Sequence, residues 1–213
     1  MDAQQLLSIV LSSNSPAPAT ELAGAPAVST EAFRAARPLV AGPADAPSAP
    51  FPIALRGTVQ KGFRRGGKDL GCPTANLSEE ALHPLSAATT TGIYYGLAQV
   101  LPRGSVDTES NLSADDCKIY PMAMSLGWNP FYKNERLSAE VHIIHEYKND
   151  FYGNEVRVLV LGYIRPELDY TSREALIDDI ETDKKVAVRS LERPAYSRYF
   201  KDALFANEQS NVR

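Results

Sequence analysis

The sequence contains little of what metal–sulfur sites, membrane spans and nucleic-acid surfaces require. Its 213 residues include 2 cysteines and 3 histidines. Cys72 and Cys117 have neither a C-x-x-C partner nor a neighbouring histidine cluster, so they predict reduced thiols. No run approaches the ~20 apolar residues of a membrane span. The formal net charge of −4 gives no general attraction for nucleic acid or for an anionic membrane, and we expect neither as a partner.

The first fifty residues have almost no aromatic side chains. Phe33 is the only aromatic residue before Phe51, and prolines and alanines alternate through the stretch. Such a composition buries too little apolar surface to offset the entropy of ordering the chain. We therefore expect a disordered tail (1–50), followed by a folded domain (51–206) and a short C-terminal tail (207–213). A cytoplasmic location is expected, with organellar targeting by the tail left open.

Beyond Phe51, segments rich in β-branched and aromatic residues recur, separated by glycine, proline, asparagine and aspartate. Runs of this kind without intervening helices predict an antiparallel sheet or barrel. The last run is apolar on both faces near its middle, which is typical of a strand buried on both sides. The segments are 53–63, 91–101, 118–128, 138–147 and 155–164.

A helix follows the last strand segment. Thr171 and Glu174 have the T-x-x-E spacing of a capping box. Apolar residues recur at helical spacing after them, so one helix face is expected to pack inward. A second short helix is expected to start near Pro194, because proline is favoured at the first helical position. The residues predict a mostly β fold, a small antiparallel barrel closed by a C-terminal helix.

Two short motifs have the residue types of a phosphate site. Residues 62–69 nearly match a P-loop, but Asp69 stands where serine or threonine is needed and Pro73 prevents the helix that should follow. They fit either a backbone cradle for phosphate with Lys68 as the charge, or a solvated basic loop. In the Pro-Thr-Ala-Asn run, Thr74 and Asn76 offer two neutral oxygens on one face of an extended chain, which suits Mg²⁺. A simple turn is the alternative.

Two charged residues lie in or beside apolar strands. Glu140 stands between Ala139 and Val141, where an idle carboxylate is costly, so it is either a working group or a solubility charge on an edge strand. Arg165 stands at a strand end before Pro166, a place where functional residues gather, with an ordinary exposed arginine as the alternative.

Taken together, these segments resemble eukaryotic riboflavin kinases over roughly residues 54–192. Several motifs in the family's order are far more specific than any one alone. They are G57-T-V-Q-K-G62, G67-K-D-L-G-C-P-T-A-N76, T91-G-I-Y-Y-G96, S125-L-G-W-N-P-F-Y-K-N134, E140-V-H-I-I-H145, D150-F-Y-G153 and G162-Y-I-R-P-E167. The resemblance implies a six-stranded antiparallel Greek-key barrel and transfer of the ATP γ-phosphoryl group to the 5′-hydroxyl of riboflavin, giving FMN.

The family's site residues fall on matching positions of this chain. The resemblance implies that Glu140 is the catalytic base and that Thr74 and Asn76 hold Mg²⁺, for which Zn²⁺ or Mn²⁺ are possible substitutes. The implied ATP-binding residues are Gly62, Lys68, Thr74, Asn76, Ile143, His145 and Tyr152. The implied flavin-binding residues are Arg165, Leu168 and Tyr170.

Residues 102–117 are polar and acidic and look like an insertion between two strands, expected to be a surface loop that leaves the site unaffected. A monomer is expected, with ATP and riboflavin as its small-molecule partners.

Two other classes of function stay open. An FMN-binding split-barrel oxidoreductase would need no Thr/Asn metal pair, and a non-catalytic flavin- or nucleotide-binding module would form no ADP.

Overall fold

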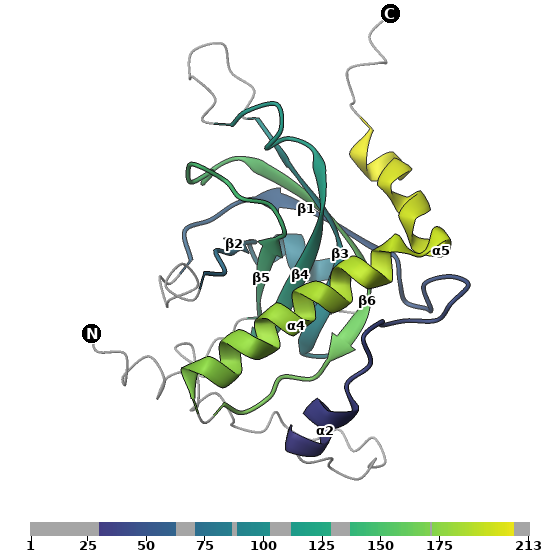
Figure 1. The fold of residues 1–213 in the computed structure, drawn as a ribbon. Helices are drawn as coiled ribbons and strands as arrows, with labels where there is room; N and C mark the ends of the chain where they lie inside the picture. The colour runs from purple at the N-terminus through teal and green to yellow at the C-terminus, as the bar shows by residue number, and fades with distance from the viewer. Residues whose placement is uncertain are drawn as a thin grey trace, which may run out of the picture.

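The computed structural model describes residues 30–62, 71–86, 89–102, 112–128, 137–170 and 172–206. Its described strands form one antiparallel sheet in the order β1-β6-β3-β4-β5-β2. Their bounds are β1 Ile53–Thr58, β2 Ala75–Asn76, β3 Gly92–Leu101, β4 Ile119–Trp128, β5 Leu137–Ile143 and β6 Glu155–Arg165. The sheet curls strongly into a half-barrel, and the long helix α4 (Arg173–Glu192) crosses its outer face (Figure 1). The predicted mostly β fold with a C-terminal helix is confirmed.

The strand order explains how the half-barrel is built. Strands β3, β4 and β5 follow one another as neighbours, and β6 returns to lie beside β3, which is the Greek-key order. The two ends of the sheet approach each other just after β1, where the N–H of Gln60 donates to the carbonyl of Asn76 at 2.9 Å. Strand β2 has only two residues inside the Pro-Thr-Ala-Asn run, so no alternation in the sequence marks it as a strand.

Alternating side chains of the central strands supply two separate cores. Along β3, Tyr94 and Ala98 point into the half-barrel, while Tyr95 and Leu97 point outward under the helices. Strand β6 divides in the same way, with Val158 in the inner core and Leu159 and Leu161 in the outer one. This explains why the last strand segment is apolar on both faces. The inner core is completed by Leu82 of η1 (Glu80–Leu82) and Leu85 of α3 (His83–Ser86).

Helix α4 begins one residue later than the capping-box spacing predicted. Its N-cap is Ser172, whose hydroxyl accepts from the N–H of Ala175 at 3.1 Å. Because the N-cap partner at N3 is then Ala175, Glu174 is not part of a capping box. The C-terminal half of α4 packs Val186 and Leu191 into the outer core.

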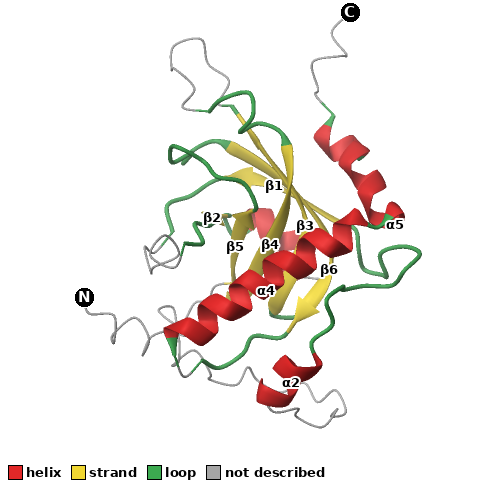
Figure 2. Cartoon of the chain, viewed as in Figure 1, coloured by secondary structure: helices red, strands yellow, loops and turns green. Residues whose placement is uncertain are grey.

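Short helices complete the C-terminal side. They are α5 (Pro194–Ser197), which begins at the proline that predicted it, η3 (Arg198–Lys201) and η4 (Ala203–Phe205). Figure 2 shows this helical segment beside the end of α4, on the outer side of the sheet. In the described ranges, none of the helices combines the length and the apolar character that crossing a bilayer requires.

Residues 30–46, which we call the strap, run along α4 and α5. The strap begins with α2 (Thr30–Ala36) and continues as an irregular chain with several bends. The N–H of Ala41 donates to the Ser190 hydroxyl at 2.9 Å, and the Arg193 guanidinium donates to the carbonyls of Ala41, Gly42 and Pro43. Part of the stretch expected to be a tail thus makes specific contacts with the domain, so packing begins before the composition changes at residue 51.

Gly42 fixes the strap at its closest approach to the domain. Its φ of 79° lies in the left-handed region that glycine adopts without steric cost. A Cβ atom at this position would lie 2.5 Å from the Tyr95 hydroxyl and 2.6 Å from the Tyr196 hydroxyl. Both hydroxyls are occupied, since Tyr95 donates to the Ala41 carbonyl and Tyr196 to the Pro43 carbonyl. A larger residue at position 42 would therefore separate the strap from the outer core.

Candidate active site

The short strand β2 brings the Pro-Thr-Ala-Asn run against β5. In the register of this pair, Asn76 lies directly opposite Glu140. Directly opposite residues of an antiparallel pair hold their Cβ atoms about 5 Å apart on the same face. The Thr74 hydroxyl donates to the Glu140 carboxylate at 3.2 Å. Three residues that sequence analysis selected from two distant segments are therefore neighbours in space.

Gly62 completes this cluster from the chain that follows β1. A Cβ atom at position 62 would lie 2.3 Å from the side-chain nitrogen of Asn76 and 2.9 Å from its amide carbon. No other residue fits without displacing the Asn76 side chain. A carboxylate, a hydroxyl and an amide thus lie together where the backbone of Gly62 meets the Asn76 side chain. We call Gly62, Thr74, Asn76 and Glu140 the β2–β5 cluster.

The environment of Glu140 differs from the one expected. Its neighbours Ala139 and Val141 are buried in the inner core, but Glu140 itself is exposed on the other face of β5. Its carboxylate is therefore solvated and is not a desolvated charge inside an apolar strand. The strand is also not the sheet edge, because β2 pairs with β5 beyond it. What distinguishes Glu140 is its neighbours in the β2–β5 cluster.

His142 anchors the turn that carries Thr74, a role that sequence analysis missed. The His142 side chain is 8% exposed, and its Nδ1 lies 2.9 Å from the Pro73 carbonyl oxygen. Because a carbonyl only accepts, Nδ1 carries the proton of the neutral ring. Burial lowers the pKa of His142 below its ordinary value, although the bond to Pro73 opposes that change. The signal available in the sequence was that His142 lies two residues after Glu140 and so shares its face of β5.

This lowered pKa predicts an acid-sensitive stability. The unfolded chain protonates His142 near pH 6.5, whereas the folded protein does so only at lower pH. The unfolded state therefore binds more protons below pH 6.5, and the free energy of unfolding falls as the pH drops from 7.5 to 5.5. We expect His142→Asn, which keeps a donor near the Nδ1 position, to fall less steeply in urea titrations at a series of pH values.

His83→Asn is the matched control, because His83 is an exposed histidine of α3. It should keep the steeper wild-type dependence. Equal slopes for wild type and His142→Asn would show that His142 does not couple folding to protonation.

Cys72, just before Pro73, is a packing residue and not a nucleophile. Its side chain is 8% exposed, and burial raises the pKa of the thiol to about 12. A thiol that stays protonated at neutral pH is inert as a nucleophile and as a metal ligand.

The residues expected at the nucleotide have different positions. Ile143 is 4% exposed and belongs to the inner core. Tyr152 is exposed, with the ammonium group of Lys61 5.9 Å from its ring centroid. His145 stacks on Tyr120 with ring centroids 4.1 Å apart and planes 12° apart. Lys68 lies outside the described residues.

His145 is held by the segment that was expected to be an independent surface loop. Its Nε2 lies 2.9 Å from Oδ1 of Asp116, which is 8% exposed. The other oxygen of Asp116 accepts from the backbone N–H and the hydroxyl of Ser113. Hydrogen bonds from Ser113 and His145 outweigh the effect of burial and hold the pKa of Asp116 below its ordinary value. The end of segment 102–117 therefore orients His145.

Two of the residues expected at the flavin, Arg165 and Tyr170, form a buried cluster instead of an exposed strand end. Arg165 is 3% exposed, and its Nε and Nη2 donate to Asp183 of α4 at 3.0 and 2.6 Å. Its Nη1 donates to the Pro166 carbonyl and its Nη2 also to the Tyr170 hydroxyl, both at 3.0 Å. Burial raises the pKa of Tyr170 to about 12, so this hydroxyl stays protonated. Leu168 lies half-buried between them in the chain.

Comparisons with known proteins identify the family of this chain. The model of the Flavokinase family, described as riboflavin kinase, matches residues 49–191, which is more than half of the chain. The chain is 47% identical over 163 residues to a riboflavin kinase of Pyricularia oryzae, covering 76% of this chain and 82% of that protein. It is 45% identical over 170 residues to a riboflavin kinase of Scheffersomyces stipitis, covering 73% of this chain and 93% of that protein.

A solved structure is similar as well. The crystal structure of riboflavin kinase from Trypanosoma brucei superposes with a TM-score of 0.59 at 29% identity, covering 78% of this chain and 96% of that one. The family match at residues 49–191 includes each strand that the structure describes, the β2–β5 cluster and most of α4. This chain belongs to the riboflavin kinase family.

Proposed function

We propose that this chain transfers the γ-phosphoryl group of ATP to the 5′-hydroxyl of riboflavin, giving FMN and ADP, with Glu140 as the group that accepts the hydroxyl proton. The observation that carries the proposal is the β2–β5 cluster, in which an exposed carboxylate stands beside a hydroxyl and an amide. Family membership supplies the reaction and both substrates.

Phosphoryl transfer requires mainly positioning and charge stabilisation from a protein. Glu140 is solvated and ready to accept a hydrogen bond from an incoming hydroxyl. The bond from Thr74 limits the orientations of its carboxylate. In that arrangement Glu140 orients the riboflavin hydroxyl toward the phosphorus and takes its proton late in the transfer, when the hydroxyl has become acidic.

The donor set of the β2–β5 cluster fits a magnesium ion. Mg²⁺ prefers hard oxygen ligands and keeps several waters, taking other ligands from substrate phosphates. Thr74 and Asn76 offer such oxygens, and the bond to Glu140 uses the Thr74 proton and leaves its oxygen lone pairs free. Bound there with ATP, Mg²⁺ would neutralise phosphate charge. Within the described residues no three His, Cys, Asp or Glu side chains form an alternative metal site.

The two substrates are assigned to different parts of the fold. His145, Tyr152 and the backbone near Ile143 lie at and beyond the end of β5 and are proposed to contact ATP, together with Gly62 and Lys68. Arg165, Leu168 and Tyr170 lie between β6 and α4 and are proposed to contact the flavin. Since Arg165 and Tyr170 are buried in protein contacts, flavin binding on these residues requires a rearrangement of the 165–170 segment.

The proposed function is tested by incubating the full chain with riboflavin and ATP while Mg²⁺ is titrated, and by measuring FMN and ADP together. We expect equal amounts of both products. Asn76→Ala should raise the Mg²⁺ midpoint by about tenfold, roughly the contribution of one hydrogen bond or ligand contact to a charged group. Riboflavin binding, followed by fluorescence quenching, should not change.

Three results would contradict the proposal. Absence of FMN would reject the kinase reaction in favour of a non-catalytic module. Turnover of riboflavin without ADP would point to a flavin oxidoreductase. An unchanged Mg²⁺ midpoint in Asn76→Ala would show that this residue belongs only to a turn.

A further inference from the structure

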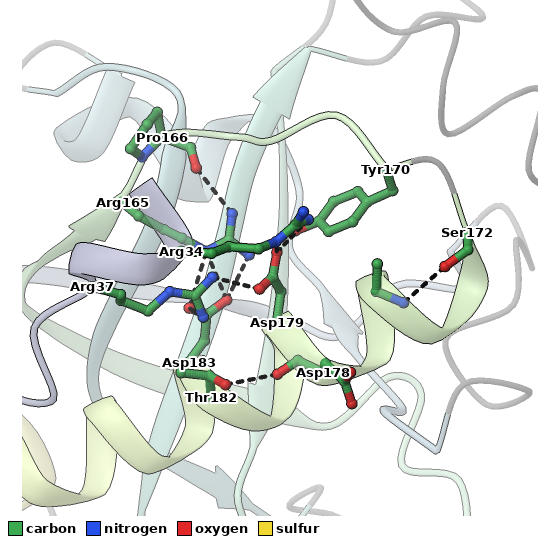
Figure 3. Close-up of polar contacts among 11 residues, drawn as sticks. Arg34, Arg37, Arg165, Pro166, Tyr170, Ser172, Asp178, Asp179, Thr182 and Asp183 are labelled. Carbon is green, nitrogen blue, oxygen red and sulfur yellow. Dashed lines mark hydrogen bonds and ion pairs between the residues drawn. The ribbon is translucent and has the colours of Figure 1, made fainter. Parts of the chain in front are cut away.

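Three arginines and two aspartates meet where the strap crosses α4. Asp179 and Asp183 are four residues apart on α4 and share one face of the helix. Their side chains are 5% and 4% exposed. Figure 3 shows Arg165 approaching them from the end of β6, and Arg34 and Arg37 approaching from the strap. The cluster therefore contains one more guanidinium group than carboxylates.

The strap arginines bind chiefly Asp179. Arg34 donates to one oxygen of Asp179 at 3.0 and 2.9 Å, and Arg37 donates to the other at 2.5 Å. Burial opposes ionisation of Asp179, but these bonds outweigh it and hold its pKa below the ordinary value. The guanidinium of Arg34 also lies 5.4 Å from the ring centroid of Tyr170. The strap thus contacts both α4 and the segment proposed to bind flavin.

Asp183 differs from Asp179 in its partners and in the direction of its pKa shift. Arg165 is its hydrogen-bonded partner, and the Nη1 of Arg37 lies 3.7 Å from its Oδ1. Burial raises the pKa of Asp183 above the ordinary value, and the nearby guanidinium groups oppose that rise. If Arg165 turned away, Asp183 would be a buried carboxylate without a hydrogen-bonded partner, which is strongly unfavourable.

Arg37 has the features of a replacement partner. Its side chain is 5% exposed, and among the described residues its Nε finds no acceptor although it is buried. A buried donor without an acceptor is uncommon and costly. A small movement of this guanidinium would bring an unused donor toward Asp183, from which another of its nitrogens is already only 3.7 Å away.

We propose that Arg37 is a positioning residue for flavin binding, which replaces Arg165 on Asp183 when Arg165 turns to contact the flavin. This inference depends on the proposed function, in which Arg165 is a flavin contact. It assigns a role to the strap, whose residues lie outside the segment 49–191 that matches the family. Arg37 acts through Asp183 and Arg165 and does not itself touch the substrate.

The test measures the riboflavin Kd by fluorescence quenching and the KM values for riboflavin and ATP, in the full chain. Arg37→Met removes the charge and keeps a long side chain, and it should raise the riboflavin Kd about tenfold because the competent conformation is less populated. The KM for ATP should stay within twofold. Arg37→Lys, which keeps a cation near Asp183, should recover most of the affinity.

A double-mutant cycle with Asp183→Asn isolates the mechanism. An asparagine needs no counter-ion, so Arg37→Met should have no further effect on riboflavin affinity in that background. Arg56→Ala removes an exposed, ion-paired arginine of β1 and serves as the matched control, with an unchanged riboflavin Kd.

The outcomes separate this inference from the function on which it depends. The inference is overturned if Arg37→Met leaves the riboflavin Kd within twofold of wild type. It is also overturned if Arg37→Met raises that Kd by the same factor in the Asp183→Asn background, or raises the KM for ATP as much as the KM for riboflavin. A tighter riboflavin Kd would also overturn it and would make the strap an inhibitory lid. An unchanged riboflavin Kd in Arg165→Ala would also overturn it, because Arg165 would then not contact the flavin. The proposed function fails instead if no FMN forms.

Discussion

Glu140→Gln is expected to lower kcat by roughly 10²-fold or more, within the usual range for general-base assistance. Glutamine keeps the shape of the side chain and can still accept the hydrogen bond from Thr74, but it cannot take the riboflavin proton. Because Glu140 is exposed, removing its charge relieves no desolvation, and the melting temperature should stay within a degree or two of wild type. The KM values should change little, since the lost interaction strengthens mainly in the transition state.

Glu155→Gln provides the matched control for Glu140→Gln. Glu155 is a partly exposed glutamate at the start of β6 that pairs with Arg56 at 2.7 Å. It carries the same change in charge on another strand of the sheet, and its kcat should match wild type. A folded Glu140→Gln protein with single-turnover rates within threefold of wild type would remove Glu140 from the chemistry.

Arg165→Ala is expected to lower the free energy of unfolding by about 3 kcal/mol, the low end of the range for breaking a buried ion pair by removing one partner. The low end applies because Arg37 remains 3.7 Å from Asp183. The KM for riboflavin should also rise, with the KM for ATP unchanged. Urea unfolding and steady-state kinetics on one preparation measure the two effects.

The companion variant is Arg165→Met with Asp183→Leu, which replaces the whole pair by apolar side chains of similar volume. Such a replacement is often neutral or stabilising, so most of the lost stability should return while riboflavin affinity does not. A loss below 1 kcal/mol in Arg165→Ala would mean that the pair contributes little to folding. An increase in the KM for ATP alone would move Arg165 to the nucleotide side.

Much of the fold was predictable because the strands have strong local signals. Alternating and doubly apolar segments identified β1, β3, β4, β5 and β6, and Pro194 marked the start of α5. Strand β2 was not predictable from local pattern, because two residues are too few for an alternation. The N-cap of α4 was placed one residue early, because Thr171 and Ser172 are both good cap residues and only the backbone geometry distinguishes them.

The β2–β5 cluster could be assembled from motifs, but its environment could not. Whether Glu140 faces solvent depends on which side of β5 meets the inner core, and its apolar neighbours along the chain gave the wrong impression. The burial of Arg165 depends on Asp183, which lies 18 residues later on another element. The contacts of the strap could not be predicted from composition either, because they use charged side chains and backbone groups, and Ala41 adds only a small side chain to the outer core.

The way α4 and its neighbours hold the strap has a consequence for how this segment evolves. Arg193 binds the carbonyls of Ala41, Gly42 and Pro43, and every amino acid offers a carbonyl. Substitutions in residues 38–46 leave these acceptors in place, so this part of the strap is free to drift, while Arg34, Arg37, Arg193 and the hydroxyl of Tyr196 remain under selection. Within that part, the close approach of Gly42 to Tyr95 and Tyr196 and the burial of Ala41 limit the size of two residues. We therefore expect homologues to retain this docking path where aligned sequences show no similarity, recognisable by a single upstream glycine and an Arg-x-x-Tyr after the helix.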